Sequence, residues 1–180
     1  MKEISLHILD IAENSVKAGA DMISISLSEN LKKDTLDIII ADNGKGMNAD
    51  AIKTITDPFT TSRTTRRVGL GIPFLKAAAE ACNGFLFIKS ESGEGTTLHA
   101  QFQHSHIDRM PIGNLQATLM QLLIGYPKIH WIFNISRDDN SFLLDDKEIK
   151  GAIGDLSLSH PQVLKAVKQI IQTGLDDLHQ

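Results

Sequence analysis

The 180-residue chain has a single cysteine, Cys82, no excess of positive charge and no long apolar run. One cysteine excludes an internal disulfide framework and suits a reducing compartment. The formal net charge of -4 at pH 7 gives no reason to expect nucleic acid or an acidic membrane as the main partner. No stretch approaches the roughly 20 apolar residues of a membrane span, and the first residues, MKEISLH, lack a signal-peptide core. We therefore expect a soluble cytoplasmic protein.

Two common phosphate-binding motifs are also missing. No G-x-x-x-x-G-K-[ST] pattern occurs, which argues against a P-loop nucleotidase. A dinucleotide-binding fold needs a strand directly before its glycines, but the glycines at 69 and 71 follow the polar stretch SRTTRRV. Any nucleotide pocket must therefore be of another design.

Apolar spacing predicts alternating helices and strands in residues 1–104. The first helix covers residues 3–18 and ends near Gly19. A polar, basic loop without periodicity occupies residues 57–69. The other predicted elements are strands 22–27 and 36–40, a short helix 49–56, a helix 72–82 capped by Asn83 and Gly84, and a hairpin of strands 85–90 and 96–102.

The second strand of this hairpin carries a directional signal. Thr96, Leu98 and Ala100 share one face because side chains alternate along a strand. This apolar face should meet the helices. Thr96 is therefore expected to point into the layer between the helices and the sheet.

Residues 105–180 read as a small C-terminal α/β extension, separate from a first domain over residues 1–104. The pattern predicts a helix over 111–125 that begins at a proline, then strands 130–136 and 141–144. Ser159 and Gln162 form a capping box for a last helix, with Pro161 at its first position. This extension carries no recognisable chemical motif.

The first helix carries polar groups that packing does not require. Asp10 and Asn14 lie four residues apart and so share one helical face. The amide oxygen of Asn14 could hold Mg²⁺, and the Asp10 carboxylate could orient or deprotonate a nucleophile. Glu13 points about 100 degrees away from Asp10 and is the weaker candidate. The alternative is an ordinary solvated helix face.

The stretch IIIADNGKGM ends an apolar strand directly in an acid. Asp42 could accept a hydrogen bond from an exocyclic amine such as that of adenine, while Gly44 and Gly46 let the backbone pass close to a flat ring. An ordinary Asp-Asn-Gly turn is the alternative. It explains Gly44 but not the second glycine.

A third stretch, TTSRTTRRVGLGI, combines arginines with glycines. Backbone N–H groups of a glycine loop that runs into a helix bind phosphate, and arginines add charge. A solvated basic loop is the alternative. The residues concerned are Arg63, Arg66, Arg67, Gly69 and Gly71.

The order of DIAENS, DNGKGM, RVGLGI and SGEGTT resembles the N, G1, G2 and G3 boxes of the GHKL superfamily. This superfamily includes type II topoisomerase ATPases, heat-shock chaperones, histidine kinases and MutL proteins. DPFTTSR is similar to the F box of the kinase branch, and ENSVKAGA is similar to the MutL form of the N box. The resemblance covers about residues 3–103.

The resemblance implies an α/β two-layer sandwich of the Bergerat type, with a mixed sheet covered by helices on one face. It also implies ATP and Mg²⁺ as cofactors. Asn14 would ligate Mg²⁺ and Asp42 would bind the adenine amine. The remaining expected contacts are Gly44, Gly46 and Met47 at the base, Gly69, Leu70 and Gly71 at the phosphates beneath a lid over about 59–69, Arg63, Arg66 and Arg67 as lid candidates by position, and Thr96 near the adenine end.

Two departures from the family pattern bear on function. The hydrolytic branches usually carry glutamate four residues before the asparagine, whereas this chain has the shorter Asp10. The chain also begins at the N-box helix, so the hairpin that carries the phosphoacceptor histidine of sensor kinases is expected to be absent. His7 is placed at the edge of the site, and the other histidines are scattered.

We therefore expect an enzyme of the ATPase or protein kinase type, which hydrolyses ATP or passes its terminal phosphoryl group to a partner protein. The alternative is a nucleotide-controlled regulatory module with little or no turnover. ATP, ADP and a protein phosphoacceptor are the expected partners, and a homodimer is compatible with the pattern.

Overall fold

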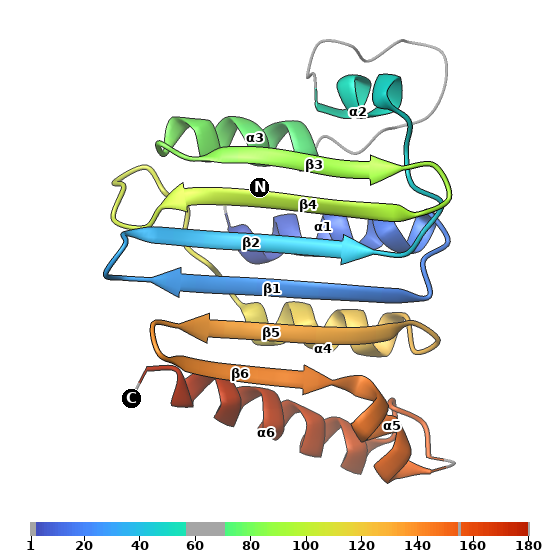
Figure 1. Cartoon of the computed structure of the whole chain (residues 1–180). Helices are drawn as coiled ribbons and strands as arrows, with labels where there is room; N and C mark the ends of the chain where they lie inside the picture. The colour runs from blue at the N-terminus through green and yellow to red at the C-terminus, as the bar shows by residue number, and fades with distance from the viewer. Residues whose placement is uncertain (1–2, 57–70, 155, 180) are drawn as a thin grey trace.

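A six-stranded mixed sheet forms the centre of the molecule (Figure 1). The structure is a computed structural model and describes residues 3–56, 71–154 and 156–179. β1 and β5 run parallel, and every other neighbouring pair is antiparallel. The strand order is β3-β4-β2-β1-β5-β6, with bounds β1 Met22–Asn30, β2 Thr35–Asp42, β3 Phe85–Glu91, β4 Gly95–Gln103, β5 His130–Arg137 and β6 Asn140–Asp145.

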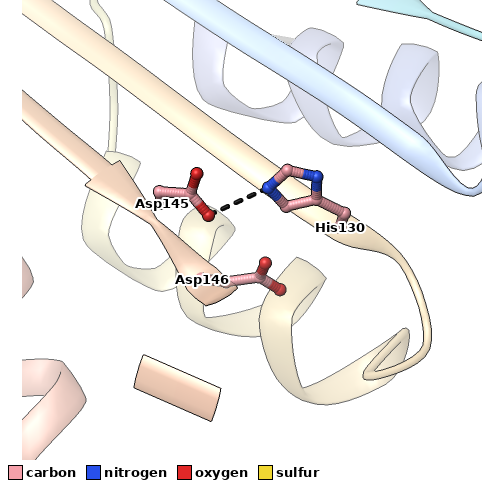
Figure 2. A group of neighbouring side chains, drawn as sticks. All are labelled: His130, Asp145 and Asp146. Atoms are coloured by element: carbon pink, nitrogen blue, oxygen red, sulfur yellow. Dashed lines mark hydrogen bonds and ion pairs between the residues drawn. The ribbon is translucent and has the colours of Figure 1, made fainter. Parts of the chain in front are cut away.

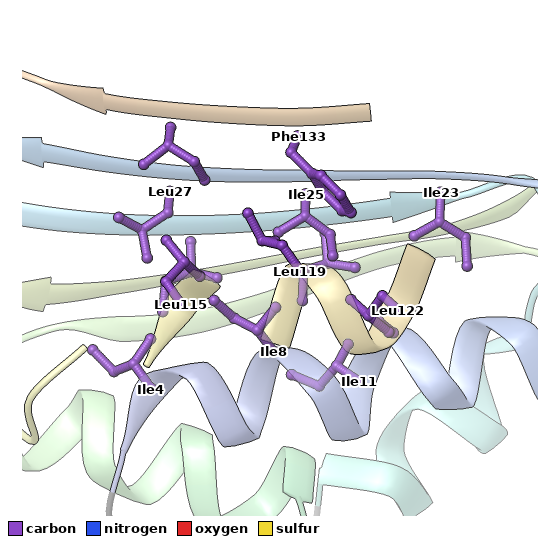
Figure 3. Close-up of a cluster of buried hydrophobic side chains, with 14 of the residues drawn as sticks. Ile4, Ile8, Ile11, Ile23, Ile25, Leu27, Leu115, Leu119, Leu122 and Phe133 are labelled. Carbon is purple, nitrogen blue, oxygen red and sulfur yellow. The ribbon is translucent and has the colours of Figure 1, made fainter. Parts of the chain in front are cut away.

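Helices α1, α3 and α4 cover one face of this sheet (Figure 1). Alternate strand residues on that face are fully buried, and Figure 3 shows Ile8 of α1 and Leu119 of α4 packed towards Ile25 of β1. The predicted two-layer α/β fold with a mixed sheet is confirmed. The helices are α1 Ile4–Lys17, α2 Ala49–Thr56, α3 Gly71–Ala81, α4 Leu115–Gly125, α5 Asp146–Ile153 and α6 Pro161–Asp177.

Helix α1 ends as its sequence predicts. Gly19 adopts a φ of 80 degrees, and the N–H of Ala20 reaches back to the carbonyl of Ser15 at 3.2 Å. This is the helix stop in which a glycine takes the left-handed conformation after the last turn. The turn leads the chain directly into β1.

The start of α1 is completed by the C-terminal segment. Glu3 precedes the helix and provides no side-chain cap. Instead, the N–H of Ile4 donates to the carbonyl of Pro111 at 3.0 Å, and the N–H of Ser5 donates to the carbonyl of Ile112 at 2.8 Å. Two of the N–H groups that a helix leaves unpaired at its start are satisfied in this way.

Residues 105–179 extend the same sheet and core, apart from residue 155, which is outside the description. β5 pairs with β1 from Met22 and His130 to Glu29 and Arg137. The side chains of Trp131 and Phe133 are fully buried in the core that the first segment also fills. The two predicted strands of this segment are confirmed. The sheet is continuous across residue 104. The division into two domains at that residue stays a prediction.

Three local predictions in this segment were wrong or incomplete. The first helix begins at Leu115, because Asn114 caps it by accepting from the N–H of Ala117 at 2.9 Å, while the carbonyl of Pro111 serves α1. The last helix is capped by His160 and not by Ser159, whose hydroxyl pairs with Ser157. Helix α5 was not predicted from the pattern.

Within the described residues, no helix combines the length and the apolar character needed to cross a bilayer.

The cap at Asn114 yields a test of this correction. Asn114→Ala removes the acceptor for the Ala117 N–H and should lower the free energy of unfolding by about 1 kcal/mol. Ser159→Ala is the matched control, because Ser159 caps no helix, and it should change stability by less than about 0.5 kcal/mol. Urea unfolding of both variants measures the difference. Equal losses would contradict the assignment of the caps.

Candidate functional site

A pocket lies between α1 and the sheet, at the end of β2. Its volume is about 150 Å³. Most of its walls are apolar, and its few polar groups come from α1, β2, β4 and the loop after β2. The lining residues are Ile11, Asn14, Ser15, Ala18, Ile40, Asp42, Lys45, Gly46, Met47, Ile55, Ile72, Ile88, Thr96 and Leu98.

Asp42 is held rigidly at one wall of this pocket. Its Oδ2 accepts a hydrogen bond from the Ser15 hydroxyl at 2.7 Å, and its Oδ1 accepts from the Gly44 N–H at 2.8 Å. The carboxylate therefore has a defined direction before any ligand arrives. Asp42 is the last residue of β2, where the strand leaves the sheet.

Sequence reasoning missed Ser15. The signal was present, because Ser15 continues the apolar stripe of Ile4, Ile8 and Ile11 along α1 and is itself buried. A hydroxyl on a core-facing stripe needs a partner, and Asp42 is that partner. A search for polar residues at the apolar positions of the helical repeat would have identified Ser15 as a candidate.

The loop after β2 lies tightly against the hairpin of β3 and β4. Gly46 has a φ of 63 degrees, and a Cβ there would lie 1.8 Å from the carbonyl oxygen of Glu91. The N–H of Met47 donates to the Ser90 hydroxyl at 2.9 Å, and Ser90 donates to the carbonyl of Gly95 at 2.7 Å. The second glycine, which an ordinary turn did not explain, is therefore required by close packing.

Thr96 also takes part in this arrangement. It is the cross-strand neighbour of Asp42, lies 2.9 Å from the Ser90 hydroxyl through its own Oγ1, and lines the pocket. Ser90 was not among the sequence candidates. It is half-buried near the end of β3, and only the tertiary structure brings it to the loop.

Asp10 lies one turn before Asn14, beside the start of α3. Its Oδ2 is buried and accepts no hydrogen bond from the described residues. A Cβ on Gly71 would lie 1.9 Å from that oxygen, so a side chain at position 71 would force the Asp10 carboxylate to move. The carboxylate thus faces the N-terminus of α3, where backbone N–H groups attract anions.

His7 lies behind Asp10 on the same helix. Its side chain is buried, and burial lowers its pKa, although the Gly71 backbone and the charge of Asp10 act in the opposite direction. The residue is therefore neutral at pH 7. It does not line the pocket, although it interacts with Asp10 and the Gly71 backbone.

The structure brings some of the predicted site residues together, and others lie outside the residues that it describes. Asn14, Asp42, Gly46, Met47 and Thr96 line one pocket, with Gly44 bonded to Asp42 and Gly71 beside Asp10. Lys45, which was not a candidate, also lines the pocket. The other predicted contacts lie outside the described residues: Arg63, Arg66, Arg67, Gly69 and Leu70.

A fixed acid at a strand end, an apolar pocket behind a helix and a second helix N-terminus beyond it define a nucleotide-binding domain of the Bergerat type. The profile of the histidine kinase-, DNA gyrase B- and HSP90-like ATPases matches residues 2–106. The chain belongs to this family, and membership implies ATP binding.

Curated relatives come from the kinase branch. The chain is 26% identical over 108 residues to an NtrY-like sensor histidine kinase of Rickettsia conorii, which covers 60% of this chain and 18% of the relative. It is 30% identical over 100 residues to sporulation kinase E of Bacillus subtilis, covering 55% of this chain and 13% of that kinase. The chain therefore matches less than a fifth of the length of these relatives.

A solved structure, the N-terminal domain of a DNA repair protein, is similar with a TM-score of 0.60 at 15% identity. The likeness covers 86% of this chain and 58% of that one. At this identity it shows the fold alone. The family profile ends at residue 106, but the structural likeness covers 86% of the chain and therefore also includes part of the C-terminal segment.

The contact at Gly46 can be separated from its backbone conformation. Gly46→Ala and Gly93→Ala both place a side chain at a positive φ, and each should cost about 1 kcal/mol for that reason. Only the Gly46 variant also meets the Glu91 carbonyl, because nothing lies within 4 Å of a Cβ at Gly93. We expect Gly46→Ala to lose roughly 1–3 kcal/mol more in chemical denaturation. Equal losses would show that the loop can move away from the hairpin.

Proposed function

We propose that this chain binds Mg-ATP in the pocket between α1 and the sheet and passes the terminal phosphoryl group to water or to a side chain of a partner protein. The observation that carries the proposal is the Asp42 carboxylate, fixed by Ser15 and the Gly44 N–H at the wall of an apolar pocket. This arrangement suits a flat, apolar ring with one exocyclic amine.

The base would lie against the apolar walls of the pocket. Each oxygen of Asp42 accepts one hydrogen bond from the protein and has a second lone pair for a ligand amine. Ile40, Ile88 and Leu98 would cover the ring faces and exclude water. Such a pocket favours adenine through shape and a single directed acceptor.

The metal would be held further along α1. The Asn14 amide oxygen lies at the pocket wall, and an oxygen donor of this kind fits Mg²⁺. When bound, Mg²⁺ neutralises phosphate charge and orients the phosphoryl group. The N-terminus of α3 beside Asp10 would add backbone N–H groups to the phosphate site.

Asp10 is the proposed catalytic residue. Its buried, unpartnered oxygen is available to orient a nucleophile or to accept its proton. Because aspartate is one methylene shorter than glutamate, a nucleophile would have to approach α1 more closely. A hydroxyl presented by a partner protein can do so as well as a water molecule can.

A regulatory binding module is the second candidate, and one observation favours it. The N-terminus of α1 is bonded to the carbonyls of Pro111 and Ile112, so the helix that carries Asn14 is coupled directly to the C-terminal segment. A shift of α1 between nucleotide states would alter this contact. A partner, including a second copy of the chain, could then read the nucleotide state without phosphoryl transfer.

Nucleotide binding tests the pocket. Asp42→Asn should weaken ATP binding roughly tenfold or more, because it removes a charged acceptor. Asn14→Ala should weaken ATP binding mainly when Mg²⁺ is present. The matched controls are Asp37→Asn, on the same strand and bonded to His99 and Gln101, and Glu13→Gln, next to Asn14 on α1.

Calorimetric titration with and without Mg²⁺ measures these effects. Parent-like affinity in Asp42→Asn and Asn14→Ala would overturn the pocket assignment. A loss of affinity in the control variants to the same degree would show that the effect comes from the fold.

Single-turnover phosphate release tests the role of Asp10. If its carboxylate acts as the base, Asp10→Asn should slow release by roughly 10²–10⁴-fold while ATP still binds. Glu13→Gln removes the neighbouring acid of α1 and should leave the rate unchanged. Release that is unaffected by Asp10→Asn would remove Asp10 as the base. The regulatory module would be favoured if the parent released no phosphate alone and transferred no labelled terminal phosphoryl group to a protein of a cell extract.

A further inference from the structure

A second cluster of ionisable side chains lies beyond the family match. His130 opens β5, Asp145 ends β6 and Asp146 opens α5, so three element ends meet at one point (Figure 2). One potential ligand atom from each residue lies within 4.8 Å of the others. The pocket described above uses none of these residues.

Asp146 is the unusual member of this cluster. Its side chain is 0% exposed, and only one of its two carboxylate oxygens has a partner among the described residues. The ammonium of Lys150 lies 2.5 Å from Oδ2 as an ion pair. Oδ1 has no partner at all within the described chain, although a buried carboxylate oxygen normally has one.

His130 and Asp145 are held in place beside it. Nε2 of His130 and Oδ1 of Asp145 lie 2.9 Å apart in a hydrogen bond. Oδ1 also accepts from the N–H of Lys147 at 2.9 Å, which caps α5. Both side chains therefore start from fixed positions at the ends of two paired strands.

The charges of the cluster leave room for a further cation. Two carboxylates face one ammonium. A metal bound at Nε2 of His130 would break the hydrogen bond to Asp145, and the neutral imidazole would then carry its proton on Nδ1. Lys150 also donates to the carbonyl of Ile129 at 2.7 Å, and its side chain is 29% exposed. The ammonium can therefore move to solvent without leaving a buried charge of its own.

We propose that His130, Asp145 and Asp146 bind a Zn²⁺ ion, which displaces the ammonium of Lys150 from the Asp146 carboxylate. One imidazole nitrogen and two carboxylate oxygens are ordinary zinc ligands, and water completes such three-residue sites. Tetrahedral ligands at these bond lengths lie about 3.4 Å apart. Nε2 of His130 and Oδ1 of Asp145, 2.9 Å apart, would have to separate by about 0.5 Å, and a pair at the 4.8 Å limit would have to close by about 1.4 Å.

The metal would join the beginning of β5 to the end of β6 and the start of α5. All three elements lie in the segment after residue 106, where the family profile no longer applies. The ion would therefore stabilise the C-terminal segment, independently of nucleotide.

Zinc titration of the full chain, stripped with chelator and free of nucleotide, tests the proposal. His130→Gln and Asp146→Asn should each weaken Zn²⁺ binding at least tenfold. Lys150→Met should tighten it, because the competing cation is gone. Glu148→Gln removes an exposed acid from the same helix α5 and should change the affinity by less than twofold.

Co²⁺ serves as a second probe, because its visible absorption reports tetrahedral coordination by these ligands. The proposal is overturned if the parent binds no Zn²⁺, or if His130→Gln binds it as the parent does. Should Asp146→Asn fail to fold, Lys150→Met decides the question, since unchanged or weaker Zn²⁺ affinity in that variant contradicts displacement of the ammonium.

Discussion

The hydrogen bond from Ser15 to Asp42, 2.7 Å long, joins the helix that carries Asn14, the metal-binding candidate, to the strand that ends in the adenine-binding candidate. This hydrogen bond holds the middle of α1 at a defined position beside the end of β2, where the pocket lies. The apolar stripe of α1 supplies the packing energy that brings these polar groups together. Without that burial, the Asp42 carboxylate would have neither its direction nor its apolar surroundings.

The C-terminal segment completes this arrangement and is more than an appendage. It adds β5 and β6 to the sheet, packs α4 against α1 and accepts two N–H groups at the start of α1. The helix at the centre of the site is therefore supported from both ends. Its C-terminus is stopped by Gly19, a local signal, while its N-terminus depends on residues about a hundred positions away.

Sequence patterns predicted the elements whose signals are local. The end of α1 at Gly19, the hairpin of β3 and β4 and the inward face of Thr96 follow from glycine conformation and strand alternation. The start of α4 was misplaced, because a proline at 111 resembles a helix start while its carbonyl serves another helix. Ser15 was missed although it lies on the apolar stripe of α1, and Ser90 was missed because its partner Met47 lies on the loop after β2.

The sequence by itself determined the family, the order of all elements except α5, and the spacing of Asp10, Asn14 and Asp42, because box motifs and hydrophobic periodicity are local properties of the chain. Only the tertiary structure decided which hydroxyl orients Asp42, why the second glycine is required, and that His130 meets Asp145 and Asp146. These are contacts between segments distant along the chain. Their geometry depends on strand register and helix packing, which no local pattern specifies.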